Sequence, residues 1–265
     1  MKIAIIGHGR MGSLVEKIAL ERGHEISCII DIDDTALYDS PEFRSSDVAI
    51  QFCTPATAVD SILRCFAAKV PVVCGTTGWK ESQPEIIKMC EEGKGTLMFS
   101  SNFSIGMNLF MALNRFLGRM MDDFDEYSAR MEEVHHIHKL DHPSGTAITL
   151  AEDLERVCSK IKGWFEPDEP CQLKGNGRCG DKDYKSEENR INEGLLPIYH
   201  RREGEVPGIH TITWESGVDS ISITHSAKSR EGFALGAVKA AEWLKGRRGY
   251  FTMADMLKEI LEPTR

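Results

Sequence analysis

The first 31 residues carry the feature that most restricts how this chain can fold. Lys2–Ile6 is a continuous apolar run, and it leads directly into the glycine-rich segment Gly7–Gly12. Apolar residues then recur at helical spacing, and a second apolar run ends in Asp31, nineteen residues after Gly12. A buried strand, a glycine turn, a helix and a second strand ending in an acid form the fingerprint of a dinucleotide-binding unit. An ordinary glycine-rich turn is the alternative, but it does not account for the flanking strands and the acid.

Each glycine of this segment has a separate predicted role. Gly7 permits a tight turn after the strand, Gly9 lets the backbone approach a pyrophosphate, and Gly12 lets the following helix pack closely against the strand. Amides at the positive end of that helix are expected to hold the phosphates. The predicted pyrophosphate-binding residues are Gly7, His8, Gly9, Arg10, Met11 and Gly12.

Asp31 indicates which dinucleotide is bound. A carboxylate at this position accepts hydrogen bonds from the adenosine ribose and repels a 2′-phosphate, and residues 32–34 supply no arginine to hold one. We therefore expect NADH to be the preferred cofactor. NADPH stays open as an alternative, because Arg10 or Arg44 could fold over the site.

Apolar runs continue to alternate with helical patterns over the first hundred residues. Strands are predicted at residues 47–52, 70–74 and 96–100, and helices at 57–68 and 81–92. This alternation predicts an α/β fold with a Rossmann-type, doubly wound parallel sheet. Ligands bind beyond the carboxyl ends of the strands in such sheets. Two loops that follow strands should therefore face the nicotinamide and the substrate, although N-capping of helices is the alternative role; their residues are Gly75, Thr76 and Thr77, and Ser101, Asn102, Phe103 and Ser104.

The pattern changes from about residue 126 to longer, mixed strands. A helix over residues 231–245 with one apolar face should pack back on the first domain. The dinucleotide-binding domain is then discontinuous, over residues 1–105 and 231–265. Residues 106–230 form an inserted α+β substrate domain built on a mixed sheet.

The segment from Glu133 to Ala147 of the inserted domain is rich in ionisable side chains. Four of the nine histidines fall within eight residues of this segment. A metal site is disfavoured, because the adjacent His135 and His136 cannot easily converge on one ion and no ligand motif accompanies them. A solvated, charged turn is a further alternative.

Acid and anion chemistry explains the segment better. His135 and Lys139 are four residues apart and should share a face in a strand or a helix. Histidine suits proton donation near neutral pH, and a neighbouring lysine can hold a carboxylate. The helix predicted after Pro143 begins with Ser144, Gly145 and Thr146, whose amides and hydroxyls suit an anion. These features predict reduction of a small acidic substrate.

Composition limits the partners. With 32 basic and 41 acidic residues the net charge is −9, which argues against nucleic-acid and membrane-surface partners. No run reaches the roughly 18–20 apolar residues of a membrane span. The eight cysteines form no C-x-x-C pair, and most lie singly in apolar runs. We expect reduced thiols in a cytoplasmic protein, with a metal or disulfide role for Cys171 and Cys179 disfavoured.

These residues resemble the dihydrodipicolinate reductase family, also called 4-hydroxy-tetrahydrodipicolinate reductases. The resemblance is carried by the run from His135 to Ala147 and by matching stretches in the same order along most of the chain, which are Gly9–Gly12, Gly75–Gly78, Asn102–Gly106, Gly208–Thr211 and Ile223–Arg230. Ile137 departs from the family pattern, which often has arginine there.

The resemblance implies a specific reaction. It implies NAD(P)H-dependent reduction of a cyclic dicarboxylate to tetrahydrodipicolinate in diaminopimelate and lysine biosynthesis, with His135 as the general acid and Lys139 as its catalytic partner. It further implies that His136 and the Ser144–Thr146 helix start bind the dicarboxylate. A homotetramer built through the sheet of the inserted domain is also implied.

Two other functions were weighed against this one. Aspartate or homoserine dehydrogenases share the first domain, but they are not expected to carry the histidine-rich run. A non-catalytic NADH sensor has no need of His135 or Lys139. Arg230 suits a substrate, hinge or ion-pair role, and the polar stretch 166–194 is predicted to be a long loop without an assigned role.

Overall fold

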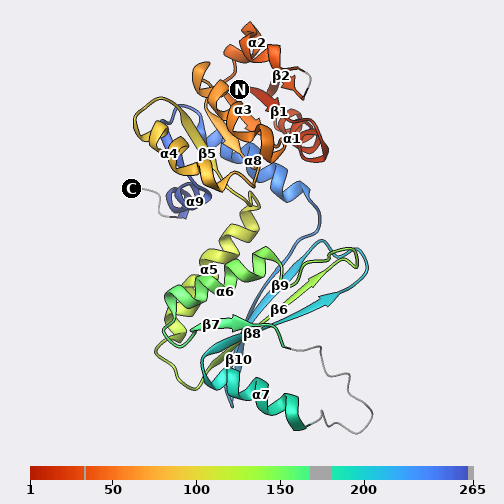
Figure 1. The fold of residues 1–265 in the computed structure, drawn as a ribbon, viewed down its shortest axis with the longest axis vertical. Coiled ribbons are helices and arrows are strands. Elements are labelled where there is room, and N and C mark those ends of the chain that lie inside the picture. The colour runs from red at the N-terminus through yellow and green to blue at the C-terminus, as the bar shows by residue number, and fades with distance from the viewer. Residues whose placement is uncertain (33, 168–180, 262–265) are drawn as a thin grey trace. The chain divides into compact units, whose positions relative to one another are not determined.

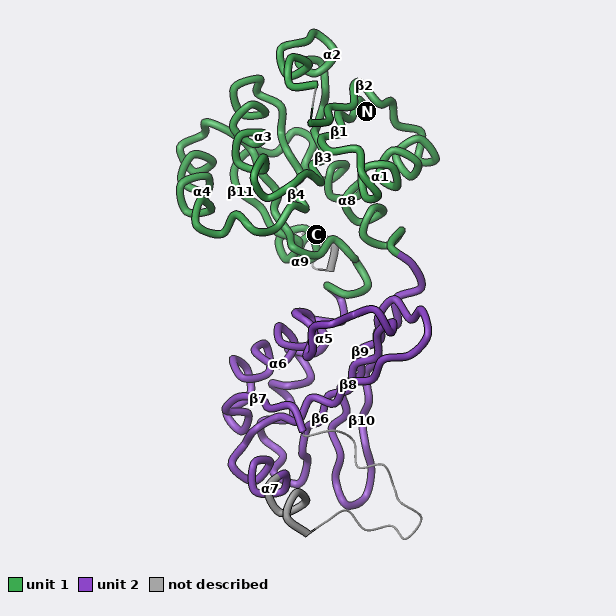
Figure 2. The backbone as a smooth tube through the Cα atoms, turned by 45° about the vertical axis from the view of Figure 1, so that its right-hand side comes forward, with its two compact units in different colours: residues 1–108, 230–265 green, residues 109–229 purple. Residues whose placement is uncertain are grey.

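The computed structural model describes residues 1–32, 34–167 and 181–261, and they form two compact units. Unit 1 comprises Met1–Asn108 and Arg230–Arg265, and unit 2 comprises Leu109–Ser229 (Figure 2). The chain thus leaves unit 1 once and returns to it once. The observed boundaries lie three residues after and one residue before the boundaries expected from the sequence.

Unit 1 is built on a six-stranded parallel sheet with the order β11-β5-β4-β3-β1-β2. Figure 1 labels three of these strands, β1, β2 and β5, among the helices of the unit. Parallel strands buried on both faces require apolar side chains on both sides, as in the burial of all four residues of β3. The edge strand β11 has only three residues and was not predicted. The strands are β1 (Lys2–Ile6), β2 (Glu25–Ile30), β3 (Val48–Gln51), β4 (Val72–Cys74), β5 (Thr96–Phe99) and β11 (Gly249–Phe251).

Helices cover both faces of this sheet, and alternate strand residues face opposite layers. Ile3 and Ile5 pack with α1 (Arg10–Glu21), α8 (Glu231–Leu244) and α9 (Met253–Leu261). Ala4 and Ile6 belong to the opposite core, with α3 (Pro55–Ala67) and α4 (Gln83–Glu91). Three short elements complete the unit, namely η1 (Thr35–Asp39), α2 (Pro41–Arg44) and η2 (Lys80–Ser82). The predicted Rossmann-type fold is confirmed.

Unit 2 is built on a five-stranded mixed sheet with the order β10-β9-β6-β8-β7. Strand β6 runs antiparallel to β9 and parallel to β8. Two helices of the unit pack on each other through Gly118, where an added Cβ would lie 2.7 Å from the Leu154 side chain. The strands are β6 (Ser128–His135), β7 (Gly163–Phe165), β8 (Leu195–Arg202), β9 (Ile209–Glu215) and β10 (Ser220–Ser226), and the paired helices are α5 (Ile105–Met121) and α6 (Gly145–Val157).

The polar stretch predicted as one long loop is partly helical. Helix α7 spans Asp181–Asn192, and Tyr199 of β8 donates a hydrogen bond to Glu187 on that helix. The prediction was wrong because it relied on polarity alone, whereas Lys, Glu and Arg are good helix formers at exposed positions.

The remaining sequence predictions concern cysteines and membrane spans. All six described cysteines are free, and Cys65, Cys74, Cys90 and Cys158 are buried. Cys171 and Cys179 lie outside the described residues. No helix in the described part of the chain combines the length and the apolar character needed to cross a membrane.

Candidate active site

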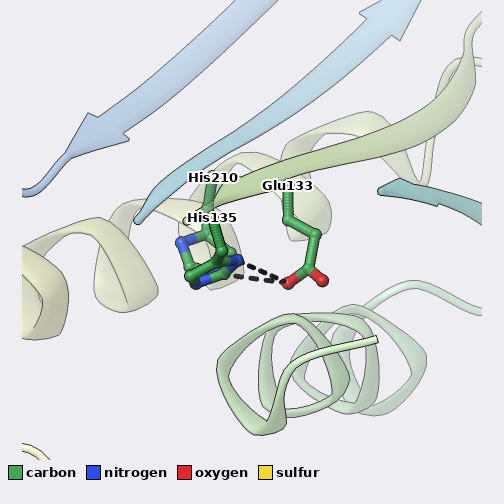
Figure 3. Close-up of side chains that lie close together, drawn as sticks. All are labelled: Glu133, His135 and His210. Atoms are coloured by element: carbon green, nitrogen blue, oxygen red, sulfur yellow. Dashed lines mark ion pairs between the residues drawn. The ribbon is translucent and has the colours of Figure 1, made fainter. Parts of the chain in front are cut away.

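The central feature of unit 2 is a buried carboxylate between two histidines. Glu133 and His135 are two residues apart on β6 and therefore point to the same face of the sheet. His210 lies opposite Glu133 on β9. All three side chains are buried (Figure 3). The Glu133 Oε2 atom lies 3.6 Å from His135 Nδ1 and 3.6 Å from His210 Nε2.

Two further groups fix the Glu133 carboxylate. The Ser144 amide donates to both of its oxygens at 3.1 Å, and Arg202 Nη2 lies 3.4 Å from Oε1. Arg202 also donates to the main-chain carbonyls of Lys139 and Asp141 at 3.1 and 2.7 Å. Glu133 therefore joins β6, the start of α6 and the segment around Lys139 into one assembly.

The protonation states follow from this environment. Burial by itself raises the pKa of Glu133, but hydrogen bonds from His210 and Ser144 and the nearby charge of His135 outweigh it and hold the pKa at about 2. Burial also disfavours the charged form of His135, and it lowers the pKa of that imidazole to about 4 despite the attraction of Glu133. Near neutral pH the free protein therefore has an ionised Glu133 and a neutral His135.

Lys139 lies at the rim of this assembly. Its Nζ donates to both carboxylate oxygens of Asp141, at 2.8 and 2.7 Å. His135 and Lys139 do not share a face of one regular element, contrary to the prediction, because β6 ends at His135 and a turn follows, in which the Lys139 amide donates to the His136 carbonyl. Lys139 still acts electrostatically on His135, since its positive charge contributes to the low pKa of that imidazole.

The predicted dicarboxylate-binding residues surround the start of α6. Ser144 caps the helix by accepting from the Ala147 amide at 3.2 Å, and its hydroxyl lies 3.2 Å from His210 Nε2. No partner is found among the described residues for the amides of Gly145 and Thr146, the first two residues of the helix. A Cβ added to Gly145 would meet no atom within 4 Å. His136 is half-buried, and its Nδ1 has no hydrogen-bond partner in the described structure. Two amides at a positive helix end thus remain available for an anion.

The glycine segment of unit 1 has the close approaches predicted for it. Gly7 has a φ of +84°, and an added Cβ would lie 2.3 Å from the Phe52 carbonyl oxygen. A Cβ on Gly12 would lie 2.1 Å from the Gly7 carbonyl oxygen, whereas Gly9 at the N-cap of α1 faces open space. Glycine is therefore required for packing at residues 7 and 12, and at residue 9 the backbone is exposed to a ligand.

The other members of this segment have distinct surroundings. His8 Nε2 lies 2.7 Å from Glu16 Oε2. Met11 packs against the core shared by α1 and α8, and Arg10 is exposed. Arg44 is bound to Asp39 through a 2.9 Å ion pair, so Arg10 is the better candidate of the two arginines for contacting a 2′-phosphate.

A pocket of about 260 Å³ lies beside the glycine segment in unit 1. Asp31 and Gly7 line it together with side chains that the sequence analysis did not single out, including Tyr38, Phe52 and Thr54. Apolar and aromatic walls with the carboxylates of Asp31 and Asp60 suit an adenosine moiety with a free ribose hydroxyl. The residues present therefore fit a dinucleotide.

The predicted loop at residues 75–77 has one buried and one exposed threonine. Gly75 is required because an added Cβ would lie 2.1 Å from the Phe52 ring, and the Thr76 hydroxyl accepts from the Cys53 amide at 3.0 Å. Thr76 is thus buried and structural, while Thr77 is exposed.

Residues 101–104 also combine structural and exposed positions. Phe103 is buried against α8, where a Cβ on Gly236 would lie 1.7 Å from the Phe103 carbonyl oxygen. Ser104 caps α5 by accepting from the Met107 amide at 3.2 Å, and its own amide donates to the Asn102 side chain. Ser101 is exposed. The alternative role of these polar residues, helix capping, is therefore observed at Ser104.

The sequence analysis did not assign site roles to Glu133, Arg202 and His210. Glu133 had a usable signal, since residues two apart in a strand share a face and it precedes His135 by two. His210 lies in the family-like stretch Gly208–Thr211, but no spacing connects it with His135. Arg202 had no signal, because it is far from His135 in the sequence and is brought to it by sheet pairing.

Comparison with known proteins agrees with this geometry. The family model described as "Dihydrodipicolinate reductase, N-terminus" matches residues 1–103, and the model for the C-terminus of the same enzyme matches residues 106–257. The chain belongs to the dihydrodipicolinate reductase family. It is 44% identical over 262 residues to 4-hydroxy-tetrahydrodipicolinate reductase of Christiangramia forsetii, with 99% of this chain and 100% of the relative covered. The Archaeoglobus fulgidus enzyme of the same name is 31% identical, with 97% of this chain and 100% of the relative covered.

Structural comparison supports the same fold for this dihydrodipicolinate reductase family member. A dipicolinate-bound dihydrodipicolinate reductase from Paenisporosarcina sp. TG-14 superposes with a TM-score of 0.72 at 22% identity, covering 95% of this chain and 97% of that one. A probable dehydrogenase from Thermotoga maritima has a TM-score of 0.53 at 11% identity, covering 96% and 92%. The chain is therefore an oxidoreductase of a nicotinamide-dependent family that acts in diaminopimelate and lysine biosynthesis.

Proposed function

We propose that this chain reduces 4-hydroxy-tetrahydrodipicolinate to tetrahydrodipicolinate, with the assembly around Glu133 and His135 as the substrate site. The 4-hydroxyl group leaves as water together with a hydrogen from C3, which gives a conjugated imine, and the reduction then adds a hydride at C4 and a proton at C3. The observation that carries the proposal is a buried, ionised Glu133 holding two histidines beside a helix start with unpaired amides. A nicotinamide cofactor, when bound, supplies the hydride.

His135 is the proposed proton donor. Its pKa of about 4 in the free protein leaves it neutral, so it must gain a proton when substrate binds. A dicarboxylate brings two negative charges, which favour the imidazolium form and raise the pKa toward neutrality. Glu133 at 3.6 Å from Nδ1 orients the ring and stabilises the imidazolium. Substrate binding thus produces the His135 imidazolium, which donates its proton during the reduction.

The carboxylates have three proposed anchors. The amides of Gly145 and Thr146 at the start of α6 receive one carboxylate, since they lie at the positive end of that helix. Lys139 and His136 receive the other, and Lys139 exchanges its Asp141 partner for the substrate. The Lys139 ammonium group also stabilises negative charge that develops on the ring during reduction.

The cofactor preference is part of the same proposal. Asp31 in the pocket of unit 1 favours NADH, because its carboxylate accepts from ribose hydroxyls and repels a 2′-phosphate. We further propose a cytoplasmic homotetramer assembled through the sheet of unit 2, as the family resemblance implies. Light scattering on the purified protein measures this state directly, and a monomer would contradict it.

Activity is tested by coupling the chain to the synthase that makes the substrate from pyruvate and aspartate semialdehyde. The expected result is a loss of absorbance at 340 nm that depends on substrate, with a higher kcat/KM for NADH than for NADPH. His135→Gln is expected to lower kcat at least a hundredfold, the usual range for loss of a general acid. His138→Gln, an exposed histidine of the same segment, is the control. No absorbance loss with either cofactor would refute the proposed activity, and near-normal turnover of a folded His135→Gln would refute the role of His135.

A further inference from the structure

A second group of ligand-type side chains lies in unit 2, apart from the assembly around Glu133. His142 belongs to the segment before α6, Glu166 follows β7 directly, and His200 lies on β8. Their ligand atoms all lie within 4.8 Å of one another. We propose that His142, Glu166 and His200 form a binding site for a divalent transition metal ion of the zinc class.

The three side chains converge on one point. Nδ1 of His142 lies 2.7 Å from Oε1 of Glu166, and Nδ1 of His200 lies 2.6 Å from the same oxygen. The two imidazole rings stack with their centroids 4.2 Å apart and their planes 14° apart. Both rings therefore present the same nitrogen to the same carboxylate oxygen, although they come from different elements.

Metal coordination requires the two stacked rings to rotate relative to each other, because an ion lies close to the plane of each imidazole that binds it. Zinc binds imidazole nitrogen and carboxylate oxygen at about 2.0–2.2 Å in a tetrahedral geometry, which places neighbouring ligand atoms about 3.3 Å apart. The observed separations of 2.6 and 2.7 Å need to open by about 0.6 Å to reach that value. Rotation of the exposed His142 side chain, with smaller rotations of the half-buried Glu166 and His200, provides such a movement without displacement of the strands.

Charge and access also favour a cation. The group includes one carboxylate, and no Lys or Arg in the described part of the chain forms an ion pair with Glu166. The side chains of His142, Glu166 and His200 are 48%, 25% and 24% exposed, so an ion can enter from solvent. Nitrogen and oxygen ligands of this type suit zinc, cobalt and nickel, and three protein ligands leave a position for water.

The assembly around Glu133 provides an internal comparison. Glu133, His135 and His210 also have ligand atoms within 4.8 Å of one another, but their carboxylate is buried and already accepts from the Ser144 amide. The Arg202 guanidinium lies 3.4 Å from it, and that fixed positive charge opposes a dication. A metal therefore fits His142, Glu166 and His200 and does not fit the proton-transfer site.

A bound ion would stabilise this part of unit 2. It would connect the segment before α6 to β7 and β8, and so hold the start of α6 where the proposed function places a substrate carboxylate. The metal site itself does not depend on the proposed reaction, and its test does not use activity.

The test is a titration of the chelator-treated, dialysed full chain. Calorimetry with Zn²⁺ and absorption spectroscopy with Co²⁺ are expected to show one ion per chain, and Zn²⁺ is expected to raise the Tm by a few degrees. His142→Ala and Glu166→Gln are each expected to weaken Zn²⁺ binding at least tenfold. Glu166→Gln keeps the shape and hydrogen-bonding capacity of the side chain while it removes the charge.

His138→Ala is the matched control. His138 is also exposed and also lies beside a carboxylate, with Nε2 3.1 Å from Glu205 Oε1, but within the described part of the chain it belongs to no group of three ligand-type side chains. It is expected to bind Zn²⁺ as the wild type does. Absence of Zn²⁺ and Co²⁺ binding to the wild type would overturn the proposal, and so would wild-type affinity in folded His142→Ala, because the three residues would then be a hydrogen-bonded group only.

Discussion

The glycines of the first turn allow packing and ligand binding to be separated by single substitutions. A Cβ at Gly12 would lie 2.1 Å from the Gly7 carbonyl oxygen, about 0.9 Å closer than the 3.0 Å below which real Cβ atoms essentially never come. A Cβ at Gly9 would meet nothing within 4 Å. Gly12→Ala is therefore expected to lower the stability of the fold, and Gly9→Ala to weaken cofactor binding alone.

The magnitudes follow from these distances. Overpacking of a closed core costs about 1–3 kcal/mol. The higher helix propensity of alanine compared with glycine offsets up to about 1 kcal/mol of this cost. Because the clash is with a main-chain oxygen, which no side-chain rotation relieves, the upper end of the overpacking range applies, and Gly12→Ala should lower the free energy of unfolding by about 2 kcal/mol. Loss of one hydrogen bond from a backbone amide to a charged phosphate costs about 1.5–3 kcal/mol. Gly9→Ala should accordingly raise the Kd for NADH about 10- to 100-fold.

Urea denaturation and NADH fluorescence titration measure the two effects on the same proteins. Gly217→Ala is the control, since Gly217 lies in unit 2 and an added Cβ there also meets nothing within 4 Å. It should change neither quantity. The reasoning is refuted if Gly9→Ala binds NADH as the wild type does, or if Gly12→Ala is as stable as the wild type.

Three further predictions concern stability and the site. His135 has a folded pKa of about 4 against 6.5 for the free side chain, so its contribution to stability is complete above pH 6.5 and is lost as the pH falls toward 4. The unfolding free energy of the wild type should drop by about 2 kcal/mol more between pH 7 and pH 5 than that of His135→Gln, and equal slopes would contradict the low pKa. Gly208→Ala would place a Cβ 3.1 Å from His135 Nε2 at a φ of +152°, so kcat should fall while the Kd for NADH stays unchanged, and a normal kcat would argue against this contact. Gly236→Ala would force a Cβ to within 1.7 Å of the Phe103 carbonyl oxygen, and thermal unfolding should show a Tm several degrees lower, with an unchanged Tm as the contrary result.

The first sheet could be predicted from the sequence because its signals are local. Each long strand is an apolar run, and each helix repeats apolar residues on one face. β11 was missed because its three residues follow Arg247 and Arg248 and are not part of a longer apolar run, unlike the equally short β4. Helix α7 was missed because its residues are almost all polar, so that only helix propensity indicates it.

The site could be predicted in part. The histidine-rich run located His135 and the start of α6, because those residues are close in the sequence. His210 and Arg202 join Glu133 only through the pairing of β6 with β9 and β8. His142, Glu166 and His200 likewise meet from three separate segments, and for that reason no spacing motif pointed to them. Pairing between distant strands is a global property of the fold, and local patterns do not contain it.

The most direct test of the central claim is to follow the hydrogen that reduces the substrate. NADH carrying deuterium at C4 of the nicotinamide is supplied with the synthase product and the wild-type chain, and the product is analysed by NMR. The account predicts tetrahydrodipicolinate with deuterium at C4, and a reaction in D₂O with ordinary NADH should instead place deuterium at C3. A product without deuterium from the cofactor, or with that label at C3, would contradict the account.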